Sequence, residues 1–146
     1  MYDIWDLLKR GFILFLMFSA FTPASGATFH VSTTHDVVLA TDSVLSLREA
    51  IAAAQDRPGP DTIRLPAGYF RLNTPEGGEG FGSFGDLVIS DPFHALTIQG
   101  PEDGEAVLDG NRAGRVFDIG SNSIVVLNRL VIFNGRVYSV FAGNNG

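Results

Sequence analysis

The sequence contains no cysteine and a single lysine, Lys9, among its 146 residues. The absence of cysteine excludes a disulfide framework, a thiolate metal site, a cysteine nucleophile and a lipid anchor on a cysteine. Acidic residues outnumber basic ones by 16 to 10, and the net charge is −6. This balance argues against the clustered Lys and Arg of a nucleic-acid-binding protein. Glycine (17 residues) and phenylalanine (12 residues) are abundant, which favours a turn-rich β protein.

The sequence also contains no long apolar run. Its longest one is short and lies near the N-terminus. It covers residues 11–21, follows two basic residues and precedes the small residues Ser25 and Ala27. This order is typical of a secretory signal peptide, and the run is well short of the roughly 20 residues that span a bilayer. We predict a signal peptide over residues 1–27, cleaved near Ala27, and a secreted or cell-surface protein. A retained N-terminal anchor is the main alternative, and a buried core helix is a third.

One amphipathic helix is expected after a short alternating strand at residues 28–33. Ser46 and Glu49 have the Ser-x-x-Glu spacing of a capping box, in which each side chain bonds the other's backbone N–H. The apolar stripe of this helix consists of Leu47, Ala50, Ile51 and Ala54. The pattern predicts a helix over 46–55 that ends before residues 58–60, Pro-Gly-Pro. For Arg48 we expect a structural salt bridge to the first coil.

From residue 61 the chain changes to short apolar segments closed by Gly, Asn or Asp. They cover residues 61–65, 69–72, 86–89, 95–100, 106–110, 115–119, 124–127 and 130–135. The segments 96–100 and 130–135 repeat one loose pattern, 34 residues apart. Such spacing, without tight two-residue hairpin turns, predicts an all-β parallel β-helix over 61–146, in which inward apolar side chains stack between coils. A β-sandwich or jelly roll is the alternative.

The segment 42–54, Asp-Ser-Val-Leu-Ser-Leu-Arg-Glu-Ala-Ile-Ala-Ala-Ala, resembles the CSLREA-type N-terminal region of bacterial exported proteins. The similarity continues through residues 58–70, which contain Asp-Thr-Ile-Arg-Leu-Pro-Ala-Gly, and resumes within 96–119. Those proteins resemble right-handed parallel β-helix proteins of the pectin-lyase-like class. The resemblance implies that residues 28–60 supply a strand and an amphipathic helix that caps the N-terminal end of the β-helix. Leu45 stands where the family motif has its Cys, which leaves this position a packing role.

Acidic side chains of the coils are the candidates for the Ca²⁺ site of a pectate-lyase-like enzyme, because Ca²⁺ takes about 6–8 oxygen ligands. The candidates are Asp86, Asp91, Asp103, Asp109 and Asp118, with Arg112 and Arg115 nearby. Their spacing matches no calcium loop, and the histidines (His30, His35 and His94) are scattered. We therefore assign no catalytic, cofactor-binding or metal-binding residue, and Ca²⁺ is the one cofactor left open. The residues that we single out are structural: Ser46, Arg48 and Glu49 at the cap, and Leu47, Ile51 and Ala54 on the buried helix face.

These observations predict an exported, non-catalytic β-helix module that binds a polysaccharide or another cell-surface ligand. One alternative is a polysaccharide lyase or hydrolase of the pectin-lyase-like type, although a mature chain without lysine excludes Schiff-base chemistry. Another is a structural capping fragment of a larger surface protein. Residues 137–143 are apolar and no amphipathic helix follows them. Because repeat proteins need polar caps, we expect further coils after residue 146 or self-association through the open C-terminal end.

Overall fold

The structure is a computed structural model that describes residues 25–38, 43–73, 85–112 and 114–137. Most of the predicted signal peptide (residues 1–24) and most of the apolar segment at 137–143 lie outside these ranges. Within them the chain forms nine short strands and one helix. No helix in these ranges is long and apolar enough to cross a membrane.

The strands form three parallel sheets, which we call sheets A, B and C. Sheet A contains β1 (Thr28–His30), β2 (Asp61–Arg64), β5 (Ala95–Gln99) and β8 (Ile124–Asn128), in that order. Sheet B contains β3 (Gly68–Arg71), β6 (Ala106–Asp109) and β9 (Leu130–Phe133). Sheet C contains β4 (Leu87–Ile89) and β7 (Phe117–Ile119).

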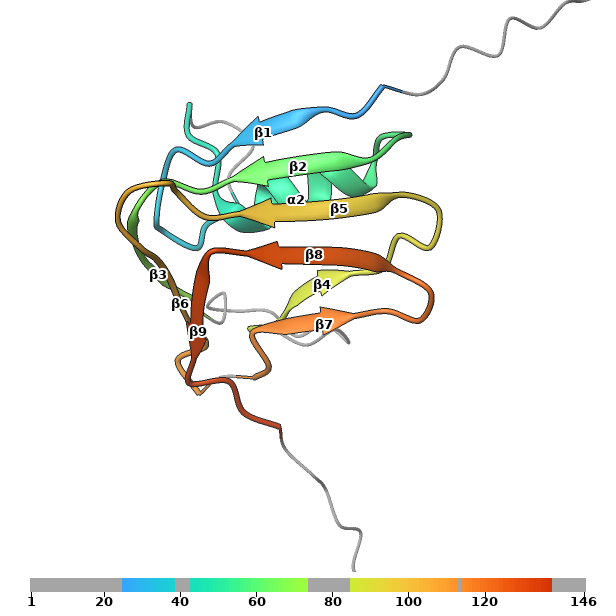
Figure 1. The fold of residues 1–146 in the computed structure, drawn as a ribbon. Coiled ribbons are helices and arrows are strands. Elements are labelled where there is room, and N and C mark those ends of the chain that lie inside the picture. Colours follow the sequence, from blue (N-terminus) through green and yellow to red (C-terminus); the bar gives the residue numbers. More distant parts are fainter. Residues whose placement is uncertain (1–24, 39–42, 74–84, 113, 138–146) are drawn as a thin grey trace, which may run out of the picture.

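The chain visits the three sheets in the same order in each circuit. One coil is β2-β3-β4, the next is β5-β6-β7, and β8-β9 belong to a third, as Figure 1 shows. Every neighbouring pair of strands is parallel and comes from successive circuits. This arrangement confirms the predicted parallel β-helix class and not the sandwich.

The repeat that we noted at 96–100 and 130–135 does not describe the stacking of the coils. Leu96 pairs with Val125 in sheet A, whereas Leu130 pairs with Ala106 in sheet B. The two segments therefore lie in different sheets. Both segments have the same residue pattern because each strand of a β-helix alternates apolar residues that point inward with residues that point outward, and then ends at a bend.

The core consists of inward side chains stacked in register from coil to coil. Ile63, Ile98 and Leu127 occupy one such column, and their exposed fractions are 0%, 0% and 37%. In sheet B, Leu108 is fully buried whereas its neighbour in the last coil, Ile132, is 42% exposed. The inward side chains are therefore buried in the first two coils, whereas those of the third coil are packed on one side only.

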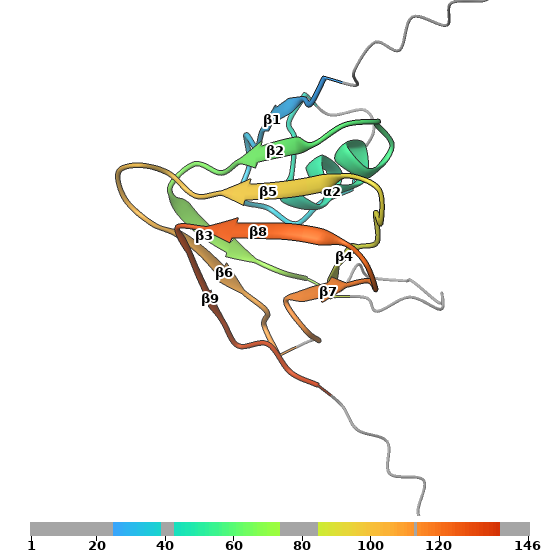
Figure 2. The same ribbon diagram turned by 45° about the vertical axis from the view of Figure 1, so that its right-hand side comes forward.

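Helix α2 (Leu47–Gln55) covers the N-terminal end of the stack. Its buried face consists of Leu47, Ala50, Ile51 and Ala54, and it packs against β1, β2 and β4. Figures 1 and 2 show the helix behind β2 and β5, on the inner side of sheet A. A parallel bridge between His35 and Arg71 brings the loop before the helix over the edge of sheet B. Thus β1, this loop and α2 together take the place of a preceding coil.

Candidate functional site

The capping residues Ser46 and Glu49 hold the start of α2. The Ser46 hydroxyl accepts a hydrogen bond from the Glu49 N–H at 3.2 Å, and the Glu49 carboxylate accepts one from the Ser46 N–H at 2.9 Å. The Ser46 hydroxyl also donates to the Val37 carbonyl at 2.7 Å, and Ser46 is completely buried. These three bonds fix the helix N-terminus to the loop that precedes it.

Arg48 links this cap to the first coil. Its guanidinium bonds both carboxylate oxygens of Asp36 at 2.8 Å, and the Asp36 side chain is only 5% exposed. The same guanidinium donates to the carbonyl of Asp86 at 2.9 Å, just before β4 begins. A bidentate ion pair with an added backbone bond is a rigid arrangement. The expected salt bridge to the first coil is thus made instead with the loop before the helix, and the first coil contributes a backbone carbonyl.

Gln55, at the end of α2, pairs with the outer edge of β4. Its side-chain amide accepts from the Ser90 N–H at 2.7 Å and donates to the Val88 carbonyl at 3.2 Å. These two bonds replace the neighbouring strand that β4 lacks on this side, which protects a free sheet edge. Sequence reasoning missed this role, because a Gln at a helix end gives no signal of which strand lies beside it.

The candidate acids do not meet at one site. Asp86 is 2% exposed and accepts from Arg115 at 2.8 Å, and Arg115 also pairs with Asp118 at 3.1 Å. Asp91 lies between β4 and β5, and Asp109 is the last residue of β6. The described residues include no group of three or more His, Asp or Glu side chains that could hold a metal ion.

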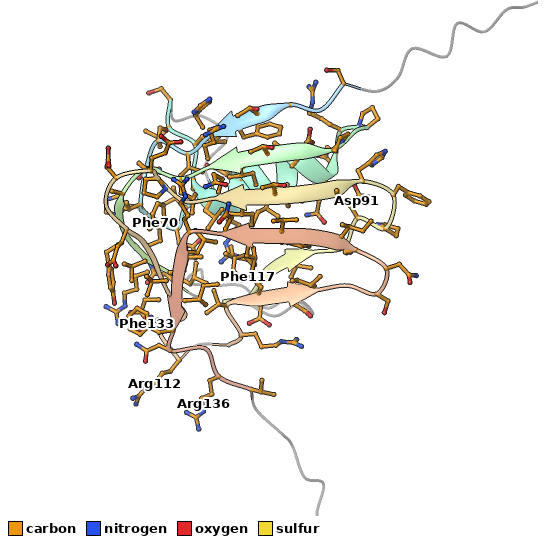
Figure 3. The ribbon with its side chains drawn as sticks, viewed as in Figure 1. Phe70, Asp91, Arg112, Phe117, Phe133 and Arg136 are labelled. Atoms are coloured by element: carbon orange, nitrogen blue, oxygen red, sulfur yellow. The ribbon has the colours of Figure 1, made fainter. Side chains whose placement is uncertain are left out.

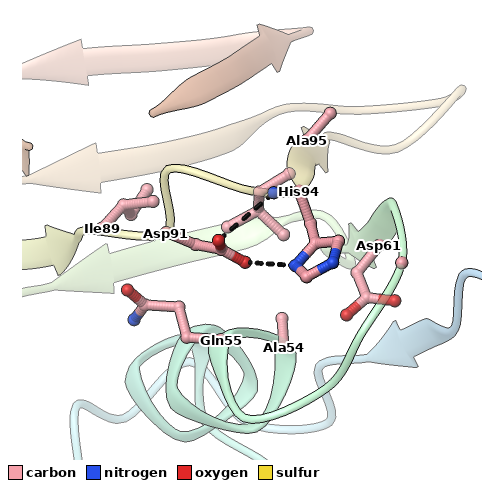
Figure 4. A pocket seen from close by; sticks show the side chains of 9 residues that line it. Ala54, Gln55, Asp61, Ile89, Asp91, His94 and Ala95 are labelled. Carbon is pink, nitrogen blue, oxygen red and sulfur yellow. Dashed lines mark hydrogen bonds and ion pairs between the residues drawn. The ribbon is translucent and has the colours of Figure 1, made fainter. Parts of the chain in front are cut away.

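Asp91 and His94 lie together in a small pocket between the end of α2 and the start of β5 (Figure 4). The Asp91 carboxylate accepts from the Phe93 N–H at 2.8 Å and contacts the His94 Nδ1 at 3.0 Å. The Phe93 bond, together with those to His94, holds the pKa of Asp91 below its usual value. Asp61 lines the same pocket from β2. The two other histidines lie apart from it, His30 on β1 and His35 in the loop before the helix.

The outer face of sheet B carries a second group, made of aromatic and polar side chains. The Tyr69 hydroxyl on β3 donates to the Asp109 carboxylate on β6. Asp109 also accepts from the Asn111 N–H and the Asn134 side-chain amide, both at 2.9 Å. The Tyr69 and Phe133 rings meet edge to face, with 6.2 Å between centroids.

Exposure separates the members of this group. Asp109 is 5% exposed, whereas Tyr69 is 52% and Phe133 is 38% exposed. The carboxylate is thus covered by its own hydrogen-bond donors, and the two rings present their free surfaces to solvent. We call Tyr69, Phe133, Asp109 and Asn134 the aromatic patch.

The shared hydrogen bond changes the acidity of both partners. The Tyr69 hydroxyl stabilises the carboxylate, which lowers the pKa of Asp109 below its usual value. The same bond raises the pKa of Tyr69, because ionising the phenol would break the bond and place a second negative charge beside Asp109. At neutral pH the pair is therefore held as a neutral phenol and an ionised carboxylate.

Two arginines, Arg71 and Arg112, lie beside the aromatic patch, and a third, Arg136, lies beyond them. Arg71 follows Tyr69 on β3 and donates to the Asn111 side chain at 2.5 Å. The Arg112 N–H donates to the Asn134 carbonyl at 3.0 Å, which places Arg112 beside the patch. Figure 3 shows the labelled side chains of Arg112 and Arg136 next to each other below β9 and Phe133. This edge of the protein is locally basic although the whole chain carries a net charge of −6.

No family model, curated protein or solved structure matches this chain. The likeness to the CSLREA-type region therefore depends on the sequence alone, at residues 42–54, 58–70 and within 96–119.

Proposed function

We propose that this protein is an exported β-helix module that binds polysaccharide on the outer face of sheet B. The observation that carries the proposal is the exposed pair of Tyr69 and Phe133 above a buried, fully bonded Asp109. A sugar ring presents C–H groups on one face, and these pack on the electron-rich face of an aromatic ring. Exposed aromatic surface rimmed by polar groups is typical of an interaction site.

The hydrogen bond of Tyr69 supports binding because it fixes the ring before a ligand arrives. A free tyrosine on a surface loses rotational freedom when it is immobilised, and this loss weakens binding. Here the hydroxyl is tied to Asp109 and the ring edge rests on Phe133. The ring is thus positioned by the fold.

The arginines indicate the chemical class of the polysaccharide. A guanidinium binds a carboxylate through two parallel hydrogen bonds, so Arg71, Arg112 and Arg136 suit the carboxylates of an acidic sugar polymer. They come from three successive coils, because Arg71 ends β3, Arg112 follows β6 and Arg136 follows β9. We therefore propose a polymer that contains uronic acids.

The proposal that the protein is exported depends on the N-terminal pattern of basic residues, a short apolar run and small residues. The resemblance to exported β-helix proteins adds to it.

Binding can be tested by calorimetric titration with a galacturonate hexasaccharide and a neutral cellulose hexasaccharide. We expect the acidic ligand to bind more tightly, and Tyr69→Ala and Phe133→Ala each to weaken its binding by about tenfold or more, the scale of about 1.4 kcal/mol. Phe93→Ala is the matched control, since Phe93 is an aromatic residue at 85% exposure away from the patch. Equal binding by all three variants would overturn the proposal. Unsaturated products appearing with Ca²⁺ would favour the lyase alternative.

A further inference from the structure

The Asp61 carboxylate, at the start of β2, is buried with too few partners. Asp61 is 4% exposed, and its Oδ1 accepts from the backbone N–H of Ala27 at 2.6 Å. Its Oδ2 is buried and has no hydrogen-bond partner among the described residues. A buried carboxylate held by one neutral donor is unfavourable, because burial removes hydration that a single N–H does not replace.

Ala27 is fixed against Asp61 from both sides. Its carbonyl accepts from the Thr62 N–H at 2.9 Å, which continues the pairing of β1 with β2 by one residue. The residue before it is also tightly placed, since a Cβ on Gly26 would lie 1.7 Å from the Pro60 carbonyl oxygen. A carboxylate oxygen and a backbone carbonyl therefore lie beside the nitrogen of Ala27 and the residue before it.

We infer that export processing cuts the Gly26–Ala27 peptide bond and that the new α-ammonium group of Ala27 forms a partly buried ion pair with Asp61. The inference rests on the proposed export. Hydrolysis by a signal peptidase uses one water molecule: its hydroxyl joins the Gly26 carbonyl carbon, and the Ala27 nitrogen leaves as an amine that takes up protons. Ala24 and Gly26 then stand at the −3 and −1 positions, where small residues are required. The cut is one residue earlier than cleavage after Ala27.

The ammonium group supplies what Asp61 lacks. It brings a positive charge and two N–H groups in addition to the one already bonded, beside a carboxylate whose Oδ2 has no partner among the described residues. The other titratable groups of the pocket are His94 and Asp91, which contact each other at 3.0 Å (Figure 4). The pocket therefore holds no separate cationic side chain for Asp61.

The processing step is tested with the full chain produced in a bacterium that exports it. We expect the exported protein, examined by intact mass and N-terminal sequencing, to begin at Ala27. An exported protein with any other first residue would overturn this inference and leave the proposed export standing. A chain that stays inside the cell with its first 26 residues attached would overturn both.

The ion pair is tested by the chemical reactivity of the α-amino group of Ala27. In a chain processed before Ala27, the α-amino group is the only primary amine, because the single lysine is Lys9. An acylating reagent should therefore react about tenfold more slowly with the native protein than with the same protein in urea. Asp61→Asn should remove the protection, whereas Asp91→Asn should keep it. If Asp61→Asn does not fold, the comparison of native and urea-treated protein decides alone, and equal rates would contradict the ion pair.

Discussion

The hydroxyl of Tyr69 donates a hydrogen bond to the carboxylate of Asp109, which lies 40 residues later in the sequence and one coil further along the fold. The third coil adds Phe133 to the same place, edge to face with the tyrosine ring. Side chains from three successive coils thus build the aromatic patch, since Asn134, which also bonds Asp109, follows Phe133 in the third coil. The proposed polysaccharide site is a product of stacking, and no single segment contains it.

The pH dependence of stability should report on this bond. The pKa of Asp109 is lowered in the folded state, so its contribution is present above the ordinary value of 3.8 and is lost as the pH falls through the folded value. The pKa of Tyr69 is raised, so its contribution is present below the ordinary value of 10.0 and is lost as the pH rises through the folded value. Tyr69→Phe keeps the ring and removes the bond.

The measurement is the difference in free energy of unfolding between the natural protein and Tyr69→Phe, followed by urea titration across pH. We expect the natural protein to be more stable by a constant amount between these limits, and the difference to shrink in strong acid and strong base. A difference that stays constant at every pH would contradict the assigned protonation states.

Core substitutions should show how completely each coil is covered. Ile98→Ala removes a side chain that is 0% exposed, and we expect it to cost about 2–5 kcal/mol in unfolding free energy. Leu127 occupies the next position of the same column but is 37% exposed, so Leu127→Ala should cost about 1 kcal/mol. Denaturant unfolding of both variants gives the comparison. Equal losses would mean that the third coil is covered in solution.

The helix cap should be sensitive to the loss of one hydroxyl. Ser46→Ala removes one accepted and one donated hydrogen bond at a buried position, and it should destabilise the protein by about 1–2 kcal/mol. Ser43→Ala is the control, because Ser43 is exposed shortly before the cap and should change stability by less than about 0.5 kcal/mol. Thermal unfolding of the two variants separates these effects.

Breaking the Arg48–Asp36 pair should leave a buried carboxylate without a cation. We expect Arg48→Met to cost about 3 kcal/mol, the low end for a buried pair, because the Arg48 side chain keeps 21% exposure. Adding Asp36→Asn should recover part of this loss, since the uncompensated charge is then gone. Arg57→Met, at an exposed arginine just after the helix, should be nearly neutral. No recovery in the double variant would contradict the interpretation.

Local features of the fold could be predicted from sequence because they depend on neighbouring residues. The Ser46–Glu49 spacing and the stripe from Leu47 to Ala54 lie within one segment, and the structure has α2 at Leu47–Gln55. The alternation of apolar and polar residues likewise places strands such as Ala95–Gln99. Each pattern predicts the secondary structure of its own segment and which face of that segment is buried.

The aromatic patch could not be predicted, because the coils differ in length. In sheet A, Asp61 pairs with Leu96 and Leu96 with Val125, which are steps of 35 and 29 residues. With unequal steps, no fixed period tells which residue of one coil stacks on which residue of the next. For the same reason the roles of Gln55 and Asp61 emerge only once the strands beside them are known.

A residue-resolved titration tests the polysaccharide site most directly. Amide chemical shifts of the processed protein would be followed by NMR while a galacturonate hexasaccharide is added. We predict changes at the outer face of sheet B, around Tyr69, Asp109 and Phe133, together with unchanged amides in β4. Changes confined to the pocket of Asp91 and His94, or no changes at all, would contradict it.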